Sequence, residues 1–505
     1  MTDVVIAGAG PNGLMLAAEL ALAGVRPLVL DPLPEPATEP KANGLVGQVV
    51  RLLDRRGLYE RLAPGRPRPA PAFVFGALPL DLADLDDHPL HVLGVPQRRL
   101  EGVLAEHAAD LGVEVRRGHA VHGLDQDGGG VTVEVDGPTG TSRVTAAFLV
   151  GADGGHSTIR GLAGIGFPGV TRDDSVSRSA HVTVPSEWVD ADGGLTVPGY
   201  GRVPGFAHHR TDRGLVVFAR FPGRADLVTT TEWDTPEPDD PMSLAEMRES
   251  LGRVLGADVP LAPPAGAGPH LLRRLRGGNT RLADRYRVGR VLLVGDAAHV
   301  HSGIGGPGLN LGLQDAANLG WKLAAEVRGT APTGLLDSYE SERRPAAERV
   351  VVSSQAQSAL LAPGSETTAL RTLVAELMAE PVVRGRIADL MSGADVRYDT
   401  GDDHPLAGRF APDVETVGAP LAVRSRTARP LWVAPAGWPA VPGLEAVEAA
   451  AGPAMLVRPD GYVAWAGTEP DGMAAALDRW VPADEFRGGV RSVPTTPAHT
   501  PRRTS

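Results

Sequence analysis

The chain has 505 residues, which is too many for one hydrophobic core, so roughly two to four domains are expected. Its formal net charge is −12 and its basic clusters are short, which argues against a nucleic-acid partner. The absence of cysteine excludes disulfides, thiolate metal ligands and a redox-active dithiol, and it suits a cytoplasmic protein. No basic region precedes the apolar run at 3–8, and no uninterrupted apolar run of about 18 residues occurs. We therefore expect neither a signal peptide nor a membrane helix.

The first part of the chain predicts a βαβ unit. The β-branched run at 3–8 is typical of a buried parallel strand, the apolar periodicity over 11–24 predicts a helix, and 25–30 predicts a second strand. Further helices are expected over 41–62 and 97–111. Strands are expected at 113–117, 120–124, 131–135 and 144–150.

The pattern changes at 171–275, where polar and apolar residues alternate and predict an antiparallel sheet in a second domain. A parallel strand is expected again at 289–294. Helices should follow over 307–328, 337–361 and 366–391, and a linker over 400–421. The segment 422–482 predicts strand, helix, strand, strand and helix, with LEAVEAA as its first helix.

The first motif is GAGPNG at 8–13, between a strand and a helix. Gly8 allows a tight turn, Gly10 lets a diphosphate approach the backbone, and Gly13 lets the helix pack on the strand. The start of the helix offers amides and a partial positive charge to the diphosphate. Asp31, at the end of the second strand, is placed to bind the ribose hydroxyls of a dinucleotide.

Two further motifs lie together after the strand VLLV. Asp296 in GDAAH is placed at a strand's carboxyl end, where a carboxylate can accept hydrogen bonds from a sugar-like chain. The glycine-rich run GGPGLN at 305–310 then opens a helix. The positive end of that helix would stabilise a flavin that becomes an anion on reduction.

Together with GADGGHS at 151–157, these motifs resemble the three fingerprints of the class A flavoprotein aromatic hydroxylases, the para-hydroxybenzoate hydroxylase family. Within that family the chain most resembles the aromatic polyketide hydroxylases of actinomycetes. The resemblance implies an α/β (α+β) fold with a Rossmann-like FAD-binding domain, an inserted antiparallel-sheet substrate domain and a thioredoxin-like C-terminal domain that lacks a CxxC. The implied FAD-binding domain comprises residues 1–70, 95–170 and 276–395, and the implied substrate-binding domain comprises 71–94 and 171–275. The C-terminal domain is expected over 400–485 and a flexible tail over 487–505.

The resemblance also implies which residues contact FAD. They are Gly8, Gly10, Pro11, Asn12, Gly13, Asp31, Lys41, Gln97, Val121, Asp153, Gly295, Asp296, Gly306, Gly308, Leu309 and Asn310. The chain departs from the family pattern at four places. Asp31 stands where Glu is more common, Lys41 and His156 stand where Arg is usual, and Ser302-Gly303 replaces two prolines.

The activity implied is an aromatic hydroxylation that uses non-covalent FAD, NADPH or NADH, and O2, through a C4a-hydroperoxyflavin. The expected substrate is an aromatic, polyketide-like small molecule, and the expected assembly is a monomer or homodimer without a metal. Baeyer–Villiger oxygenation or epoxidation is the nearer alternative, and a protein that only holds FAD is the more distant one. The sequence identifies no catalytic base. His208 and His209 are adjacent in a predicted strand, so at most one of them faces a pocket.

Overall fold

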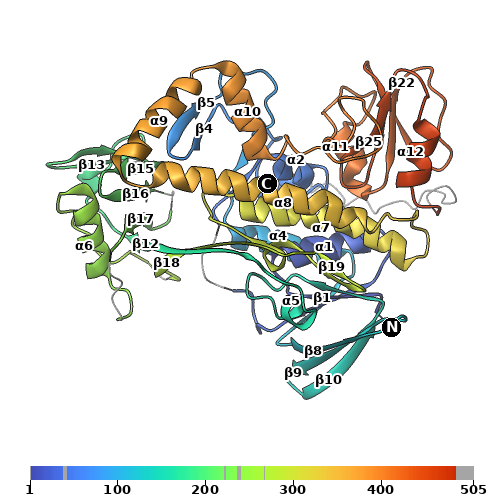
Figure 1. Cartoon of the computed structure of the whole chain (residues 1–505), viewed down its shortest axis with the longest axis horizontal. Helices are drawn as coiled ribbons and strands as arrows, with labels where there is room; N and C mark the ends of the chain where they lie inside the picture. The colour runs from blue at the N-terminus through green and yellow to red at the C-terminus, as the bar shows by residue number, and fades with distance from the viewer. Residues whose placement is uncertain (1, 38–41, 221–222, 236–239, 267, 485–505) are drawn as a thin grey trace, which may run out of the picture.

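The computed structural model of the chain describes residues 2–37, 42–220, 223–235, 240–266 and 268–484. Figure 1 shows a central α/β body, an antiparallel sheet with one helix at the left, and a smaller C-terminal domain at the right. This arrangement confirms the predicted fold class. Within the described residues, no helix is both long enough and apolar enough to cross a membrane.

A six-stranded sheet runs through the central body. In order across the sheet, its strands are β19 (Arg287–Val288), β20 (Val291–Leu293), β11 (Phe148–Gly151), β1 (Val4–Ala7), β2 (Pro27–Asp31) and β7 (Glu114–Arg117). All neighbours pair in parallel except β19 and β20, so the carboxyl ends of five strands meet at one edge. Every residue of β1, β2, β11 and β20 is buried, which explains their continuous apolar sequences.

Helices cover this sheet. α1 (Pro11–Leu22) follows β1 and packs against α4 (Gln97–Asp110) and α7 (Pro307–Val327). The helix α8 (Ser338–Leu361) packs on α7 and extends from the central body to the antiparallel sheet (Figure 1). A hairpin sheet of β8 (Ala120–Gln126), β9 (Val131–Gly137) and β10 (Gly140–Ala146) projects from the central body.

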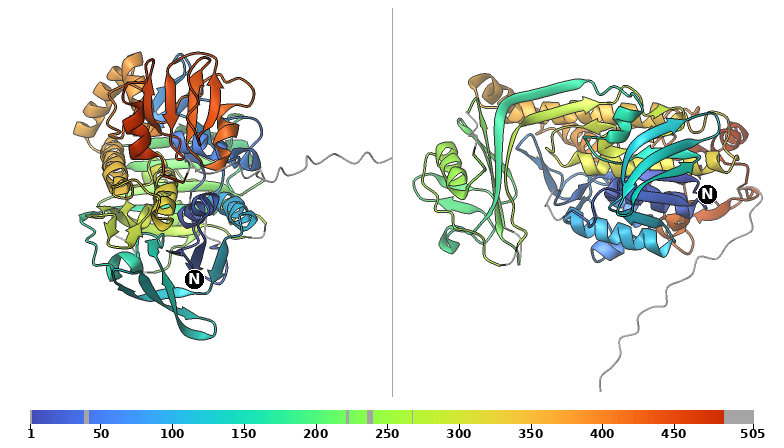
Figure 2. Two further views of the ribbon diagram at one scale, coloured as in Figure 1. Left: turned by 90° about the vertical axis from the view of Figure 1, so that its right-hand side faces the viewer. Right: turned by 90° about the horizontal axis from the view of Figure 1, so that it is seen from below.

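The antiparallel sheet contains, in order, β15 (His208–Thr211), β16 (Gly214–Ala219), β17 (Asp226–Trp233), β12 (Gly169–Val182), β18 (Leu272–Leu282) and β21 (His299–Val300). The helix α6 (Leu244–Leu255), which the sequence analysis did not predict, packs on one face over a core that includes Val216, Phe218 and Val228. β12 and β18 run past the expected boundaries at 171 and 275 and join this sheet to the central body (Figure 2).

The C-terminal domain is a four-stranded sheet of β23 (Glu445–Ala449), β22 (Leu431–Pro435), β24 (Ala454–Val457) and β25 (Val463–Gly467), followed by α12 (Met473–Trp480). The predicted helix at LEAVEAA is wrong, because this segment is β23. Val447 and Ala449 are buried while Glu448 between them is exposed, and parallel pairing with β22 outweighs the helix propensity of Glu and Ala.

Three other expected elements are divided in the structure. The helix predicted over 41–62 is a short strand β3 (Leu45–Val46), which pairs with β6 (Val92–Leu93), and two short helices, α2 (Gln48–Asp54) and α3 (Tyr59–Leu62). The helix predicted over 366–391 is interrupted before Pro381, giving α9 (Ser365–Leu377) and α10 (Pro381–Ser392). The strand predicted at 144–150 is split between β10 and β11.

Buried charges join the C-terminal domain to the central helices. Glu342 of α8 contacts both Arg458, at 2.6 Å, and Lys322 of α7, at 2.7 Å, and Arg458 also pairs with Asp460. All four side chains are at most 4% exposed. We refer to them as the Glu342 cluster. The C-terminal apolar core also includes Trp321 of α7, whereas the sheet under α6 has a core of its own.

Candidate functional site

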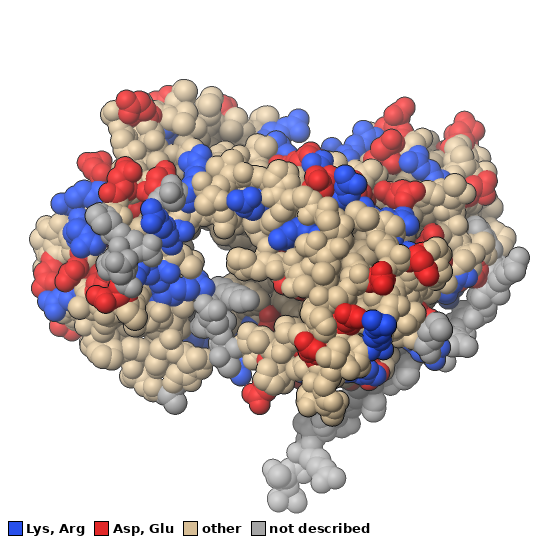
Figure 3. Space-filling view, turned by 60° about the horizontal axis from the view of Figure 1, so that its bottom comes forward, with Lys and Arg blue, Asp and Glu red and all other residues tan. Residues whose placement is uncertain are grey.

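A cavity of about 1030 Å³ lies between the carboxyl edge of the parallel sheet and the antiparallel sheet. The space-filling view shows the surface deeply hollowed between these two bodies (Figure 3). Residues from all the sequence motifs line it. From the predicted set, the lining residues are Gly8, Gly10, Pro11, Asn12, Asp31, Gln97, Asp153, Asp296, Gly306, Gly308 and Leu309.

Three helices begin at the wall of this cavity. α1 begins after Gly10, α4 after Pro96 and α7 after Gly306, and none of these N-cap residues provides a side-chain hydrogen bond to its helix. α1 and α7 begin with prolines, and the amides that follow in their first turns remain available to a ligand, whereas the first amide of α4 already donates to the carbonyl oxygen of Ala42. Each helix also adds a partial positive charge. Such an arrangement favours a ligand with anionic or strongly accepting groups at several places along its length.

The three glycines of the first motif have different structural roles. Gly8 has a φ of 110°, and a Cβ there would lie 2.4 Å from the carbonyl oxygen of Ala152. A Cβ at Gly13 would lie 2.0 Å from the carbonyl oxygen of Gly8. A Cβ at Gly10, by contrast, would meet no described protein atom within 4 Å. Gly8 and Gly13 are thus required by packing, whereas the bare backbone at Gly10 faces the cavity.

Asp31 fixes the glycine loop at the end of β2. Its Oδ2 accepts a 2.7 Å hydrogen bond from the backbone of Ala9, and its Oδ1 accepts one from the backbone of Leu33 at 3.0 Å. Arg117 at the end of β7 lies 3.5 Å from the same carboxylate and also lines the cavity. Asp31 is therefore already oriented by the backbone, and Arg117 adds a cation that the sequence analysis did not identify.

Asp296 stands on the cavity wall in the short turn η2 (Gly295–Ala297), directly after β20. Its side chain is exposed, and no described residue donates a hydrogen bond to its carboxylate. The turn itself is held from behind by Asp315 of α7, whose Oδ2 accepts from the backbone of Gly295 at 3.2 Å and contacts His299 Nε2 at 2.7 Å. Asp315 is in turn paired with Arg343 of α8 at 2.7 Å.

This buried arrangement explains why an acid is found inside α7. Asp315, His299 and Arg343 are all at most 1% exposed. Burial alone would raise the pKa of Asp315, but the neighbouring Arg343 and His299 outweigh it and the pKa is lowered. Asp315 therefore stays ionised and fixes the turn that carries Asp296.

Asp153 has a local structural role. Its Oδ1 accepts from Ser157 Oγ at 2.6 Å and its Oδ2 accepts from the backbone of Ile159 at 3.0 Å, so it orders the start of α5 (Thr158–Leu162). Gln97, at the start of α4, bonds to the backbone of Ala42 and to Glu101. Both Asp153 and Gln97 reach the cavity, but their polar atoms already have partners within the protein.

Other predicted contacts lie outside the cavity lining. Gly295 is buried, and a Cβ there would lie 1.9 Å from Asn12 Nδ2, so its role is close packing. Asn310 links Val46 of β3 to the start of α7 through its amide. Val121 packs on the central core from β8. Lys41 lies outside the described residues, as does the predicted tail at 487–505.

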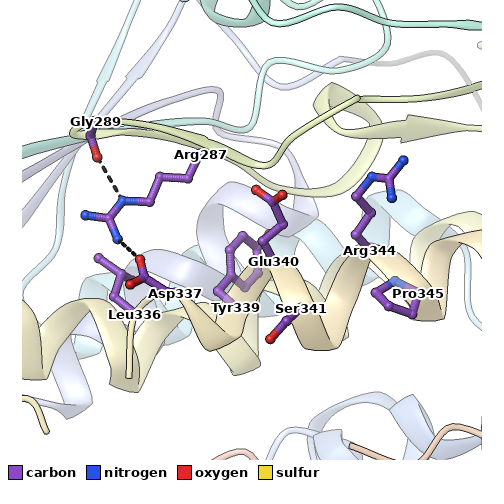
Figure 4. A pocket seen from close by; sticks show the side chains of 9 residues that line it. All are labelled: Arg287, Gly289, Leu336, Asp337, Tyr339, Glu340, Ser341, Arg344 and Pro345. Atoms are coloured by element: carbon purple, nitrogen blue, oxygen red, sulfur yellow. Dashed lines mark hydrogen bonds and ion pairs between the residues drawn. The ribbon is translucent and has the colours of Figure 1, made fainter. Parts of the chain in front are cut away.

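A second cavity, of about 570 Å³, lies between β19 and the start of α8 (Figure 4). Arg287 there bonds to Asp337 at 2.7 Å and to the carbonyl oxygen of Gly289 at 2.8 Å, while Glu340 accepts from the backbone of Tyr286. None of the residues predicted from the motifs lines it, and these charged groups have partners. We therefore assign the functional site to the larger cavity.

The residues of the larger cavity fit a bound FAD. Asn12 Oδ1 is buried beside the cavity without a hydrogen-bond partner among the described residues. A buried amide oxygen of this kind usually has a donor. The open space at Gly10, the uncapped helix starts and the free carboxylate of Asp296 provide further positions for a long ligand with phosphates and hydroxyls.

Two family models match the chain. The model described as FAD binding domain matches residues 1–354, and the model described as aromatic-ring hydroxylase, C-terminal, matches residues 404–483. The first covers the three motifs and the antiparallel sheet, and the second covers the C-terminal sheet with β22 to β25.

Named relatives match almost the entire chain. A 12-dehydrotetracycline 5-monooxygenase/anhydrotetracycline 6-monooxygenase of Streptomyces rimosus is 42% identical over 95% of this chain and 98% of the relative. A rifampicin monooxygenase of Streptomyces venezuelae is 38% identical over the same shares. The solved structure of OxyS anhydrotetracycline hydroxylase from Streptomyces rimosus has a TM-score of 0.82 and 39% identity, over 95% of this chain and 99% of that one. With its three cofactor motifs in one cavity, the chain belongs to the class A flavoprotein aromatic hydroxylases, which are FAD-dependent monooxygenases.

Proposed function

We propose that this monooxygenase hydroxylates a polycyclic, polyketide-like aromatic compound, and that it oxidises NADPH or NADH and consumes O2 in doing so. The observation that carries the proposal is the single cavity that connects the glycine motifs to the antiparallel sheet. One end has the helix starts and carboxylates suited to FAD, and the other has Phe73, Phe206 and His208, which suit an aromatic ligand. The relatives described above are named for anhydrotetracycline and for rifampicin, which supports a large substrate.

Each part of the cavity has a proposed task. The start of α1 and the backbone at Gly10 receive the diphosphate, Asp31 and Arg117 the adenosine end, Asp296 the ribityl chain, and the start of α7 the flavin ring. FAD, when bound, supplies the electrons from the nicotinamide and the activation of oxygen. The protein's own contribution is to hold the ring and the substrate at a fixed distance and to exclude water from between them.

The proposed reaction is tested with purified holoprotein and a panel of simple phenols, naphthoquinones, anhydrotetracycline and rifampicin. At least one polycyclic member should accelerate NADPH or NADH oxidation and gain one oxygen atom by mass spectrometry. The structure of that product separates ring hydroxylation from a lactone or an epoxide. If no member accelerates oxidation or gains oxygen, the proposed substrate class is wrong.

The flavin should leave the protein without bond cleavage. Because the chain has no cysteine, a cysteinyl link to the flavin is excluded. Acid precipitation should therefore release the yellow colour into the supernatant, where FAD is identified by chromatography. Colour that stays with the precipitate would indicate a histidyl link and would contradict non-covalent binding.

Asp296→Ala is expected to weaken FAD binding and to uncouple NADPH oxidation from hydroxylation. Charge-assisted hydrogen bonds of a carboxylate contribute about 1.5–3 kcal/mol each, so the affinity should fall by roughly one to two orders of magnitude. A ring held less firmly should meet the substrate less accurately, and more H2O2 should be released per product. FAD affinity and the ratio of H2O2 to product measure both effects.

Asp153→Ala is the matched control for Asp296→Ala. The Asp296 carboxylate has no hydrogen-bond donor in the described protein, so its loss should leave the melting temperature of the apoprotein unchanged. Asp153 orders α5, so its loss should cost about 1 kcal/mol of stability. A loss of stability with normal coupling in Asp296→Ala would instead assign Asp296 a structural role.

A further inference from the structure

The face of the antiparallel sheet opposite α6 carries a row of five side chains, four of them polar, from the edge strand β15 across to β18. His208 pairs with Val217, Val217 with Thr229, Thr229 with Ser179, and Ser179 with Arg273. Directly paired residues of antiparallel strands share a face, so these five side chains form one line across β15, β16, β17, β12 and β18. At a strand spacing of about 4.8 Å the line is roughly 19 Å long.

Both ends of this line reach the cavity, because His208 and Arg273 line it. The line lies on the face opposite α6, where every one of its five members is only partly buried. Ser179 and Thr229 bond to each other through their hydroxyls at 3.0 Å, and Ser177 and Thr231, one step along the same face, do so at 2.9 Å. This face of the sheet therefore carries two hydroxyl pairs between His208 and Arg273, whereas the face under α6 carries apolar residues together with the buried ion pairs of Arg178.

His208 differs from the other histidines near the cavity. His299 is bonded to Asp315, and His301 Nδ1 contacts the carbonyl oxygen of Ser302. No described residue forms a hydrogen bond with either ring nitrogen of His208. Burial lowers the pKa of His208, so the ring is neutral near pH 7 and one nitrogen can accept a hydrogen bond from a hydroxyl group. The same burial makes the imidazole a weaker base, so it can take a proton only from a hydroxyl that is more acidic than an ordinary phenol.

Its chain neighbours give a second contrast. His209 points to the opposite face, where its Nε2 lies 2.6 Å from Tyr200 OH, so one of the two adjacent histidines reaches the cavity. Phe206, two residues before His208, has a φ of 57°, which is unfavourable for an aromatic residue. That conformation places Phe206 in the cavity wall with 55% of its surface exposed. The aromatic ring of Phe206 and the imidazole of His208, a hydrogen-bond acceptor, thus both line the cavity.

We propose that His208 binds an acidic phenolic hydroxyl of the substrate and accepts its proton, while the substrate ring contacts Phe206. The inference rests on the proposed function and narrows it to substrates that carry a phenol on the edge facing the sheet. In the step, the phenolic O–H bond breaks and the proton forms an N–H bond with the imidazole. The electron pair stays on the phenolate oxygen, which makes the ring more electron-rich. The imidazolium and the phenolate then form an ion pair with no net charge, and the step requires no further reactant.

The test compares three variants of the holoprotein with wild type in binding 2,6-dihydroxyanthraquinone, whose acidic hydroxyls form no internal hydrogen bond, and its dimethyl ether. His208→Leu removes both nitrogens at similar size, and His208→Gln keeps a hydrogen-bonding group that cannot accept the proton. His209→Gln changes the neighbouring histidine on the opposite face. Affinity is measured by fluorescence titration, and ionisation by the red-shifted phenolate absorption of the bound dihydroxy probe.

Wild type and His209→Gln should bind the dihydroxy probe with a phenolate band. His208→Leu should lose that band and bind about ten- to a hundredfold more weakly, because a charge-assisted hydrogen bond is lost. His208→Gln should lose the band with a smaller loss of affinity. The dimethyl ether should bind wild type and all variants equally. FAD content and NADPH oxidation without substrate should be the same in wild type and His209→Gln, because His209 lies outside the cavity lining.

Four results would overturn the assignment. A phenolate band or full affinity in His208→Leu would show that another group receives the hydroxyl. An equal loss of affinity for the dimethyl ether would show that His208 only shapes the wall. If His209→Gln lost the phenolate band and the affinity to the same extent, the cause would be a disturbance of β15 and not the loss of the His208 side chain. If wild type bound neither probe, the proposed binding of a phenol by His208 would be rejected. The proposed function is decided separately, by the test of NADPH or NADH oxidation and oxygen incorporation with the panel of aromatic compounds.

Discussion

Gly10→Val is expected to abolish FAD binding while the apoprotein remains folded. The backbone of Gly10 is extended, with φ −77° and ψ −177°, a conformation that valine adopts readily, and no described protein atom lies within 4 Å of a Cβ there. The side chain would instead occupy the path of the diphosphate. Crowding costs about 1–3 kcal/mol and each lost bond to a charged group about 1.5–3 kcal/mol, so affinity should fall by roughly a hundred- to a thousandfold or more.

The other two glycines of the motif are the controls. Gly8→Ala and Gly13→Ala would place a Cβ at 2.4 Å and 2.0 Å from backbone oxygens, so both variants should lose stability before flavin is added. Flavin occupancy by absorbance and the melting temperature of the apoprotein separate the two behaviours. Wild-type occupancy in Gly10→Val would reject the assignment of the diphosphate to this loop.

Glu342→Gln is expected to destabilise the attachment of the C-terminal domain by about 3–5 kcal/mol, because it leaves the cations of the Glu342 cluster with Asp460 alone. Arg458 lies 4.7 Å from the ring of Trp480, so tryptophan fluorescence reports on this region during urea unfolding. Glu348→Gln on the same helix removes an exposed pair with Arg344 and should cost at most about 0.5 kcal/mol. Equal stability of both variants would contradict a stabilising role for the cluster.

The same glutamate should limit stability in acid. Burial alone would raise the pKa of Glu342, but Arg458 and Lys322 outweigh it and lower the pKa from 4.5 to about 2. A lowered carboxylate pKa stabilises the folded state above pH 4.5, and this contribution, of about 3 kcal/mol, is lost as the pH falls towards 2. Urea midpoints measured across that interval should fall more steeply for wild type than for Glu342→Gln.

The sequence analysis located the cofactor motifs because each depends on a short local pattern of strand, glycine and helix. Gly10 and Asp296 could be found in this way, since a residue directly after a buried strand is placed at the sheet edge whatever the rest of the chain does. The helices α1, α4, α7 and α8 were predictable because their apolar periodicity is also a local pattern. LEAVEAA was mispredicted because its strand conformation comes from pairing with β22, which local propensity does not encode.

The supports behind the motifs could not be predicted, because they depend on contacts between distant segments. Asp315 was visible as an acid within a helix, but its partners His299 and Arg343 are brought to it only by the packing of α7 against η2 and α8. Asn310 contacts Val46 from 264 positions away. The direction of His208 rather than His209 into the cavity follows from the register of β15 on β16, which the alternating pattern alone leaves open.

The placement of β20 beside β11 has a consequence for how the chain folds during synthesis. β20 completes the parallel sheet, but the ribosome makes it only after β12, β15, β16, β17 and β18. Until then β11 has an unpaired edge made of residues that are all buried in the finished protein. The nascent chain therefore exposes an unpaired, apolar strand edge while the whole segment between β11 and β20 is synthesised. Chains that end before β20 should be prone to aggregation, and the protein should depend on chaperones that shield this edge.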